Sequence, residues 1–120
     1  TSRSVHSIGY LPHKTNRVTT VFSTFNFSIL FEGQGELIMD GKRWEVKAPC
    51  VITQWPGAKM DYGPTEFWEE LYIVYHAELL PDLKATGYAD PTRPVWSFSA
   101  MSECRKMLSQ ILSWGSAISE

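Results

Sequence analysis

Hydrophobic and polar residues alternate in the first half of the chain, and this pattern predicts β-strands. Between residues 21 and 32, large apolar side chains occupy every second position: Phe25, Phe27, Ile29 and Phe31. The opposite face carries Asn26, Ser28 and Glu32, together with Leu30. A period of two is typical of a strand with one face in the core. The glycines of Gly33-Gln34-Gly35 interrupt this run, and we expect a bulge or a bend there.

Residues 36–46 predict a β-hairpin. Asp40-Gly41 supplies the two positions of positive φ that a type I′ turn requires. With that turn, Leu37 faces Trp44 across the hairpin, so both side chains lie on one side of the sheet.

Two further strands are expected at residues 51–55 and 67–76, separated by the sharp turn of Pro56-Gly57. In the second strand one face carries Glu70, Tyr72, Val74 and His76. Polar groups in a sealed core each need a partner, so this face is unusual for a core strand. Two interpretations stay open. The face is the solvent side of a surface strand, or it is a pocket wall where Tyr72 stacks on a ligand and Glu70 accepts hydrogen bonds from hydroxyl groups.

The two ends of the chain differ from this middle part. Residues 1–16 are polar, contain Gly9 and Pro12, and predict an arm or loop that leads into the first strand. Residues 77–96 are rich in proline and predict irregular structure with one short helix around residues 79–85.

Residues 97–120 predict a helix, with Ser99 as the N-cap. Apolar or small residues recur in it at spacings of three and four: Met101, Cys104, Leu108, Ile111 and Gly115. This stripe either packs on the chain's own barrel or forms a dimer contact of coiled-coil type.

These elements define a fold class. Short strands with frequent turn signals and no interleaved helices predict a mainly β protein, an antiparallel barrel or jelly roll with one or two C-terminal α-helices. We divide the chain into an N-terminal arm (1–16), a barrel (17–96) and a C-terminal helix (97–120) that is the candidate dimerisation element.

Length and charge narrow the classes of function. The chain has 120 residues, enough for one domain with a real core, and a formal net charge of −2. It has no clustered basic face for nucleic acid and no apolar run long enough to span a membrane. Two cysteines without a Cys-x-x-Cys motif favour a cytoplasmic protein. Because the chain starts at Thr1 and ends within a helical pattern, we expect it to be a fragment of a longer protein.

The sequence offers little for catalysis or metal binding. Its three histidines, His6, His13 and His76, form no His-x-His pair. Neighbouring residues of a strand point to opposite faces, so Glu69 and Glu70 cannot form a carboxylate pair. No Gly-x-Ser-x-Gly motif occurs. We therefore expect a binding domain, with no metal, no cofactor and no enzymatic activity.

A series of short motifs covers residues 17–76 in a characteristic order. The motifs are Phe31-Glu32-Gly33-Gln34-Gly35-Glu36-Leu37, the Asp40-Gly41 hairpin, Ala48-Pro49-Cys50-Val51-Ile52, Trp55-Pro56-Gly57, Tyr62-Gly63, and Trp68 followed by Tyr72-Ile73-Val74-Tyr75. Together they resemble the N-terminal effector-binding and dimerisation domain of AraC-type transcription regulators.

That resemblance implies a cupin barrel that binds a small effector, often a sugar. It also implies a homodimer formed through helices after the barrel, and a separate DNA-binding domain with two helix-turn-helix units. Nothing in this chain matches the DNA-binding domain, so DNA would be bound only through a domain outside this chain.

The resemblance also implies ligand-binding positions. In the arabinose-responsive member, an Arg, a Tyr, a His and an aromatic residue hold the sugar. The Arg falls near Arg17, the Tyr on Tyr62 and the aromatic residue on Tyr72, whereas Glu70 occupies the His position. That departure argues against the same sugar but leaves a polyol-like ligand open. Where metal-binding cupins carry a His, this chain has Met60. We further expect Trp44 or Trp55 to supply apolar wall.

The sequence thus predicts the sensor domain of an AraC-type regulator that binds a small carbohydrate-like effector. Two other functions stay open. One is a stand-alone cupin enzyme acting on a sugar or small acid, which stoichiometric metal would support. The other is a pure dimerisation module with a filled barrel, which a core without a cavity would support.

Overall fold

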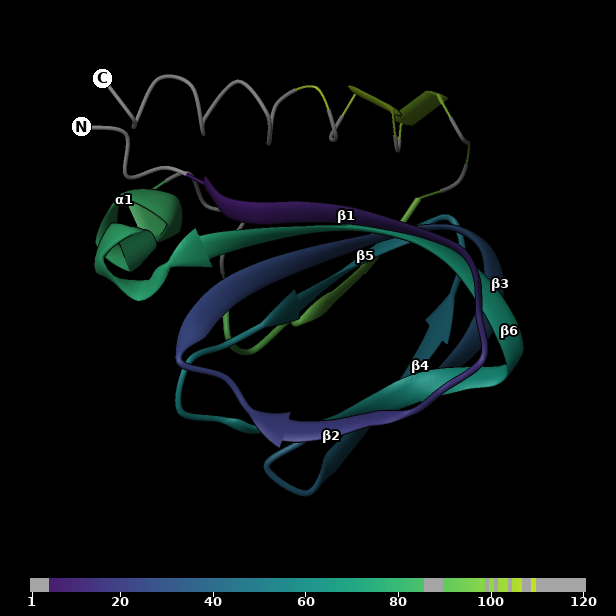
Figure 1. Ribbon diagram of the computed structural model, residues 1–120, viewed down its shortest axis with the longest axis horizontal. Coiled ribbons are helices and arrows are strands. Elements are labelled where there is room, and N and C mark those ends of the chain that lie inside the picture. The colour runs from purple at the N-terminus through teal and green to yellow at the C-terminus, as the bar shows by residue number, and fades with distance from the viewer. Residues whose placement is uncertain are drawn as a thin grey trace.

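The computed structural model describes residues 5–85, 90–98, 100, 102, 103, 105, 106 and 109, and its main feature is one curved, mainly antiparallel sheet (Figure 1). Seven strands, one 3₁₀ helix and one short α-helix are defined within these residues. Their bounds are β1 Val5–Lys14, β2 Val18–Val21, β3 Thr24–Met39, β4 Lys42–Lys47, β5 Cys50–Gln54, β6 Lys59–His76, η1 Ala77–Leu79, α1 Leu80–Ala85 and β7 Val95–Ser97.

The long strands β3 and β6 form the centre of the sheet and pair with each other from Thr24↔His76 to Met39↔Met60. Along its outer edge, each of them pairs with two further strands. In one half the strand order is β1-β6-β3-β5-β7, and in the other half β2 pairs with β6 while β4 pairs with β3. Figure 1 shows that β2 and β4 lie across the interior from β1 and β5, so the sheet wraps around its own inner face.

The bend between these halves depends on glycine. Gly33 has a φ of +101°, and the β3–β6 register shifts on both sides of it. At Gly35, a Cβ atom would lie only 2.1 Å from the backbone oxygen of Gly63. No side chain fits at that approach, so the expected interruption at Gly33-Gln34-Gly35 is confirmed.

Both faces of β3 are buried from Phe25 to Leu30, because the sheet there has core on its outer side as well as its inner side. On the outer face, Phe25 packs edge-on against Phe27 and Trp55, with ring centroids 5.0 and 4.8 Å apart. In the other half of the β3–β6 pair, Leu37 and Met60 are fully buried. Phe25 and Phe27 are therefore core residues, as their alternation predicts.

The hairpin prediction is confirmed. Asp40 and Gly41 have φ values of 49° and 85°, and Leu37 is the register partner of Trp44. The short helix expected around residues 79–85 is also present, as η1 followed by α1.

The expectation of a loop at the N-terminus is wrong for residues 5–14, which form β1 and pair with β6. Gly9 and Pro12 lowered the strand propensity, but both are accommodated. Tyr72 occupies the space that a side chain at position 9 would need, and Pro12 falls in a register irregularity between Leu11 and Lys14.

In the C-terminal segment, residues 102, 103, 105, 106 and 109 are helical. The predicted dimer stripe, Met101, Cys104, Leu108, Ile111 and Gly115, lies outside the described residues and stays a prediction. Of the helices in the described part of the chain, none has the length and apolar character that crossing a membrane requires.

Candidate functional site

A cavity of about 370 Å³ lies on the inner face of the sheet. This volume falls in the range of small-molecule binding sites. Its wall is built by β1, β2, β3, β5 and β6 and by the turns beside β2. The lining residues are Leu11, Lys14, Asn16, Val18, Phe22, Asn26, Ser28, Gln54, Tyr62, Glu70, Tyr72 and Val74.

Buried polar side chains form a continuous chain along this wall, which we call the inner polar chain: Gln54, Ser28, Glu70 and Lys14. Gln54 Nε2 donates to Ser28 Oγ at 2.8 Å, and Ser28 Oγ donates to Glu70 Oε2 at 3.0 Å. Lys14 Nζ lies 3.3 Å from Glu70 Oε1. The four residues come from β5, β3, β6 and β1, which are neighbours in the sheet, so the chain runs across four adjacent strands.

The ion pair in this chain is removed from solvent. The side chains of Lys14 and Glu70 are 4% and 3% exposed. Trp68 Nε1 donates a further hydrogen bond to Glu70 Oε1 at 2.8 Å, so that three donors contact the carboxylate. Such partners are what makes a buried charge tolerable.

Aromatic rings cover the same pair. Lys14 Nζ lies 4.9 Å from the ring centroid of Tyr62 and 5.7 Å from that of Trp68, which are cation–π distances. Burial, and then the nearby charge of Glu70, raises the pKa of Tyr62 well above its usual value. Its phenol is therefore neutral at physiological pH.

One polar atom of the wall has no partner among the described residues. Gln54 is fully buried, and its Oε1 accepts no hydrogen bond there, although its Nε2 is bound to Ser28. A buried acceptor without a donor is costly, and a ligand that brings an O–H or N–H group would remove that cost.

Three of the predicted site residues come together in this cavity. Tyr62, Glu70 and Tyr72 all line it, from two parts of β6. In the structure, Glu70, Tyr72 and Val74 of this face line the cavity, so this part of the strand is a pocket wall, and ligand contacts of Glu70 and Tyr72 stay a prediction. The cavity also speaks against the filled barrel that a pure dimerisation module would have.

The other three predicted residues are not part of the cavity wall, which corrects the expected site. Trp55 is 6% exposed and packs on Phe25, on the outer face of β3. Trp44 is half-buried on β4, with Lys42 Nζ 5.1 Å from its ring centroid.

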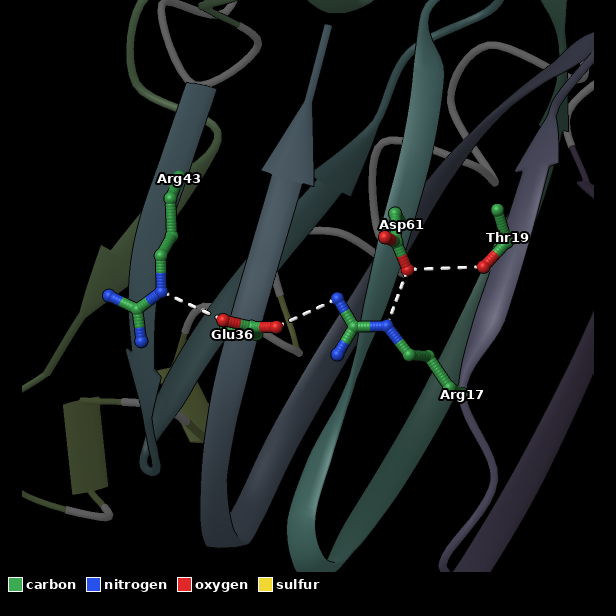
Figure 2. Close-up of polar contacts among 5 residues, drawn as sticks. All are labelled: Arg17, Thr19, Glu36, Arg43 and Asp61. Atoms are coloured by element: carbon green, nitrogen blue, oxygen red, sulfur yellow. Dashed lines mark hydrogen bonds and ion pairs between the residues drawn. The ribbon is translucent and has the colours of Figure 1, made fainter. Parts of the chain in front are cut away.

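Arg17 lies on the outside and is held there by ion pairs (Figure 2). Its Nε is 2.5 Å from Asp61 Oδ1, and its Nη2 is 2.8 Å from Glu36 Oε2. Glu36 Oε1 also accepts from Arg43 Nε at 2.7 Å, and Asp61 Oδ1 accepts from Thr19 Oγ1 at 3.1 Å. We call Arg43, Glu36, Arg17, Asp61 and Thr19 the outer ion-pair chain.

Sequence reasoning missed Lys14, Ser28 and Gln54. A local signal existed for Ser28, because it alternates with the apolar residues of β3 and so faces away from Phe27. None existed for Lys14, which sits in a polar segment and is buried only because its strand pairs with β6 beside Glu70.

The cavity wall offers little to a metal ion. Glu70 is the carboxylate among the lining residues, and it is already engaged by Lys14. The described residues contain no group of three or more His, Cys, Asp or Glu side chains suited to hold a metal. His13 is exposed and stacks on Phe67, with ring centroids 4.5 Å apart.

The chain shares its fold with proteins of known structure. No protein-family model and no curated protein matches the chain. Among solved structures, it is similar to ethanolamine utilization protein Q (EutQ) of Salmonella typhimurium, with a TM-score of 0.51 and 18% identity. That match covers 58% of this chain and 57% of the other. EutQ of Clostridium difficile gives a TM-score of 0.50 and 17% identity over 59% of this chain and 52% of that chain.

Neighbours among the solved structures also include cupin-fold proteins. A Cupin 2 conserved barrel domain protein of Salinispora arenicola matches with a TM-score of 0.42 and 14% identity, over 72% of this chain and 90% of that chain. The matched part spans little more than half of either EutQ chain. At these identities the likeness to EutQ shows a shared, mainly antiparallel β fold and does not extend to function.

Proposed function

We propose that the chain is the ligand-sensing domain of an AraC-type transcription regulator and binds a small, carbohydrate-like effector in the inner cavity. One observation carries the binding part of this proposal. The cavity combines the rings of Tyr62 and Tyr72 with a buried polar chain that still has an unpaired acceptor on Gln54. Aromatic rings cover the C–H patches of sugars, and buried polar groups hold their hydroxyls.

The regulatory part of the proposal is supported by the order of motifs in residues 17–76, which resembles the AraC-type sensor domain. In this function the domain is cytoplasmic, forms a homodimer and controls a DNA-binding domain outside this chain. Effector binding would change the population of two arrangements of the dimer, which requires different effector affinities in the two.

We propose binding rather than catalysis because, among the described residues of the cavity wall, neither Tyr62 nor Glu70 is set up to react. The Tyr62 phenol is neutral, and Glu70 is engaged by three donors. A general base needs a pKa near the working pH and access to the substrate proton.

A thermal-shift screen tests this function. The purified protein is heated with monosaccharides, polyols and sugar acids, with and without EDTA. A ligand at 100 times its Kd stabilises the fold by about 2.7 kcal/mol, which is a visible shift in Tm. We expect a shift from a subset of the sugars that EDTA does not change.

Two results would contradict the proposal. A panel without any shift would argue against a carbohydrate-like effector. A loss of stability in EDTA would favour the stand-alone metal cupin enzyme instead. Analytical ultracentrifugation with and without the stabilising sugar then tests the homodimer.

A further inference from the structure

The charges on the cavity wall balance. Lys14 and Glu70 are the two charged residues among those that line it, and they lie 3.3 Å apart with both side chains almost fully buried. The described part of the wall therefore carries no net formal charge. A ligand with a net charge would bury that charge without a counter-charge, which low-polarity surroundings strongly disfavour.

The hydrogen-bonding capacity that remains is unevenly distributed. Glu70 already accepts bonds from Lys14, Trp68 and Ser28. Lys14 carries three N–H donors, and in the described structure one of them has an oxygen acceptor. Gln54 Oε1 has no donor among the residues that the structure describes. The groups ready for a ligand are thus a donor on Lys14 and an acceptor on Gln54, at the two ends of the inner polar chain.

A hydroxyl group both donates and accepts, so a polyhydroxylated ligand satisfies both ends. The rest of the wall, with Tyr72, Val74 and Leu11, suits the C–H face of such a ligand.

We infer that the cavity selects ligands of zero net charge, that Lys14 and Gln54 are its specificity-determining contacts with ligand hydroxyls, and that Glu70 is a positioning residue that holds and neutralises Lys14. This inference rests on the proposed ligand-sensing function and names its ligand class: neutral sugars or alditols rather than sugar acids or amino sugars.

Isothermal titration calorimetry at pH 7 with matched probes tests the inference. The probes are glucose and galactose, their alditols, glucuronate and galacturonate, and glucosamine and galactosamine, with arabinose and xylose as shorter neutral sugars. We expect at least one neutral probe to bind about tenfold or more tightly than its acidic and amino counterparts. A wild-type protein that prefers the acid or the amine would overturn the inference while leaving the sensor function standing.

Charge variants make the test independent of which sugar fits. Glu70→Gln leaves the wall with a charge of +1 and should shift the preference towards the uronates. Lys14→Met leaves it at −1 and should shift the preference towards the amino sugars. The double variant is neutral again and should restore the wild-type ranking. An unchanged ranking in folded single variants would show that the pair does not set the selectivity.

Gln54→Met tests the acceptor, and Gln34→Met, at an exposed position on β3, is its matched control. We expect Gln54→Met to lower the affinity for the neutral ligand about tenfold or more, and Gln34→Met to leave that affinity unchanged. Circular dichroism checks that each variant folds. Where a single variant does not fold, the order of probe affinities measured for the wild type tests the inference. If no probe binds the wild type and none shifts its Tm, the sensor function fails and the inference fails with it.

Discussion

Two chains of polar contacts cross this sheet, and they differ mainly in their access to water. The inner polar chain runs from β1 through β6 and β3 to β5. The outer ion-pair chain of Figure 2 runs from Arg43 on β4 through Glu36 on β3, Arg17 and Asp61 on β6 to Thr19 on β2. The carboxylates of both chains lie on the two central strands, with Glu36 on β3 and Asp61 on β6 outside and Glu70 on β6 inside.

Similar ion pairs have different effects in these two chains. Outside, Arg17 is 42% exposed and water competes with each of its contacts, so each pair contributes little to stability. Inside, a lost partner leaves a buried charge that water cannot reach. The inner chain thereby fixes the shape and charge of a cavity, whereas the outer chain joins strand surfaces.

The largest expected difference comes from removing one carboxylate of each chain. Glu70→Ala leaves the ammonium of Lys14 buried without its counter-ion and should destabilise the fold by about 3–5 kcal/mol. Urea unfolding followed by Trp fluorescence measures this loss. Glu36→Ala, its matched control in the outer chain, should cost much less. Equal losses for the two variants would show that burial does not separate the two chains.

A smaller change removes one hydroxyl from each chain. Ser28→Ala takes a donor from Glu70 and an acceptor from Gln54, and should cost about 1.5–3 kcal/mol because the bond goes to a buried charge. Thr19→Val removes the corresponding donor to Asp61 outside and should be close to neutral. The same urea experiment compares them, and a Thr19→Val loss as large as that of Ser28→Ala would contradict the comparison.

The smallest expected effect is a loss of folding stability at acidic pH that comes from the outer ion-pair chain. The hydrogen bond from Arg43, then that from Arg17, lowers the pKa of Glu36, and the hydrogen bond from Arg17 lowers that of Asp61. Because both folded-state pKa values lie below their unfolded values, the stabilisation is complete above the ordinary carboxyl pKa. It is lost as pH falls from about 4.5 through the folded pKa values.

Unfolding curves at low and high salt measure this loss of stability. They cover roughly pH 2.5 to 7, the range in which carboxyl groups titrate. The Glu36→Gln/Asp61→Asn variant should lose less stability over that range than the wild type, and high salt should shrink the difference. A wild-type profile that the double variant reproduces would show that the outer chain contributes nothing to the acid response.

Much of the framework could be predicted because its signals are local. The Asp40-Gly41 turn, the bend at Gly33 and Gly35, and the shared face of Glu70 and Tyr72 each follow from residues close together in the sequence. The face that looks inward could not be predicted, because it depends on how β6 packs against strands far away in the sequence.

The residues of the site could not be predicted fully from the sequence for the same reason. Lys14 reads as a solvated residue of a polar segment, and only its distance to Glu70 and the rings of Tyr62 and Trp68 make it part of a wall. Arg17 fits the expected ligand position by resemblance, but Asp61 and Glu36 hold it outside. Both outcomes depend on pairings across the sheet, which spacing along the chain does not encode.

The position of Lys14 has a consequence for how the molecule opens. Strand β1 is an edge of the described sheet, and such edges exchange their amide hydrogens through local opening. Because Lys14 ends this strand and is the counter-ion of Glu70, β1 cannot detach at that end without leaving an unneutralised carboxylate beneath it. The amides near Lys14 should therefore be protected from deuterium exchange beyond what their edge position suggests, and a ligand held by Lys14 should slow their exchange further.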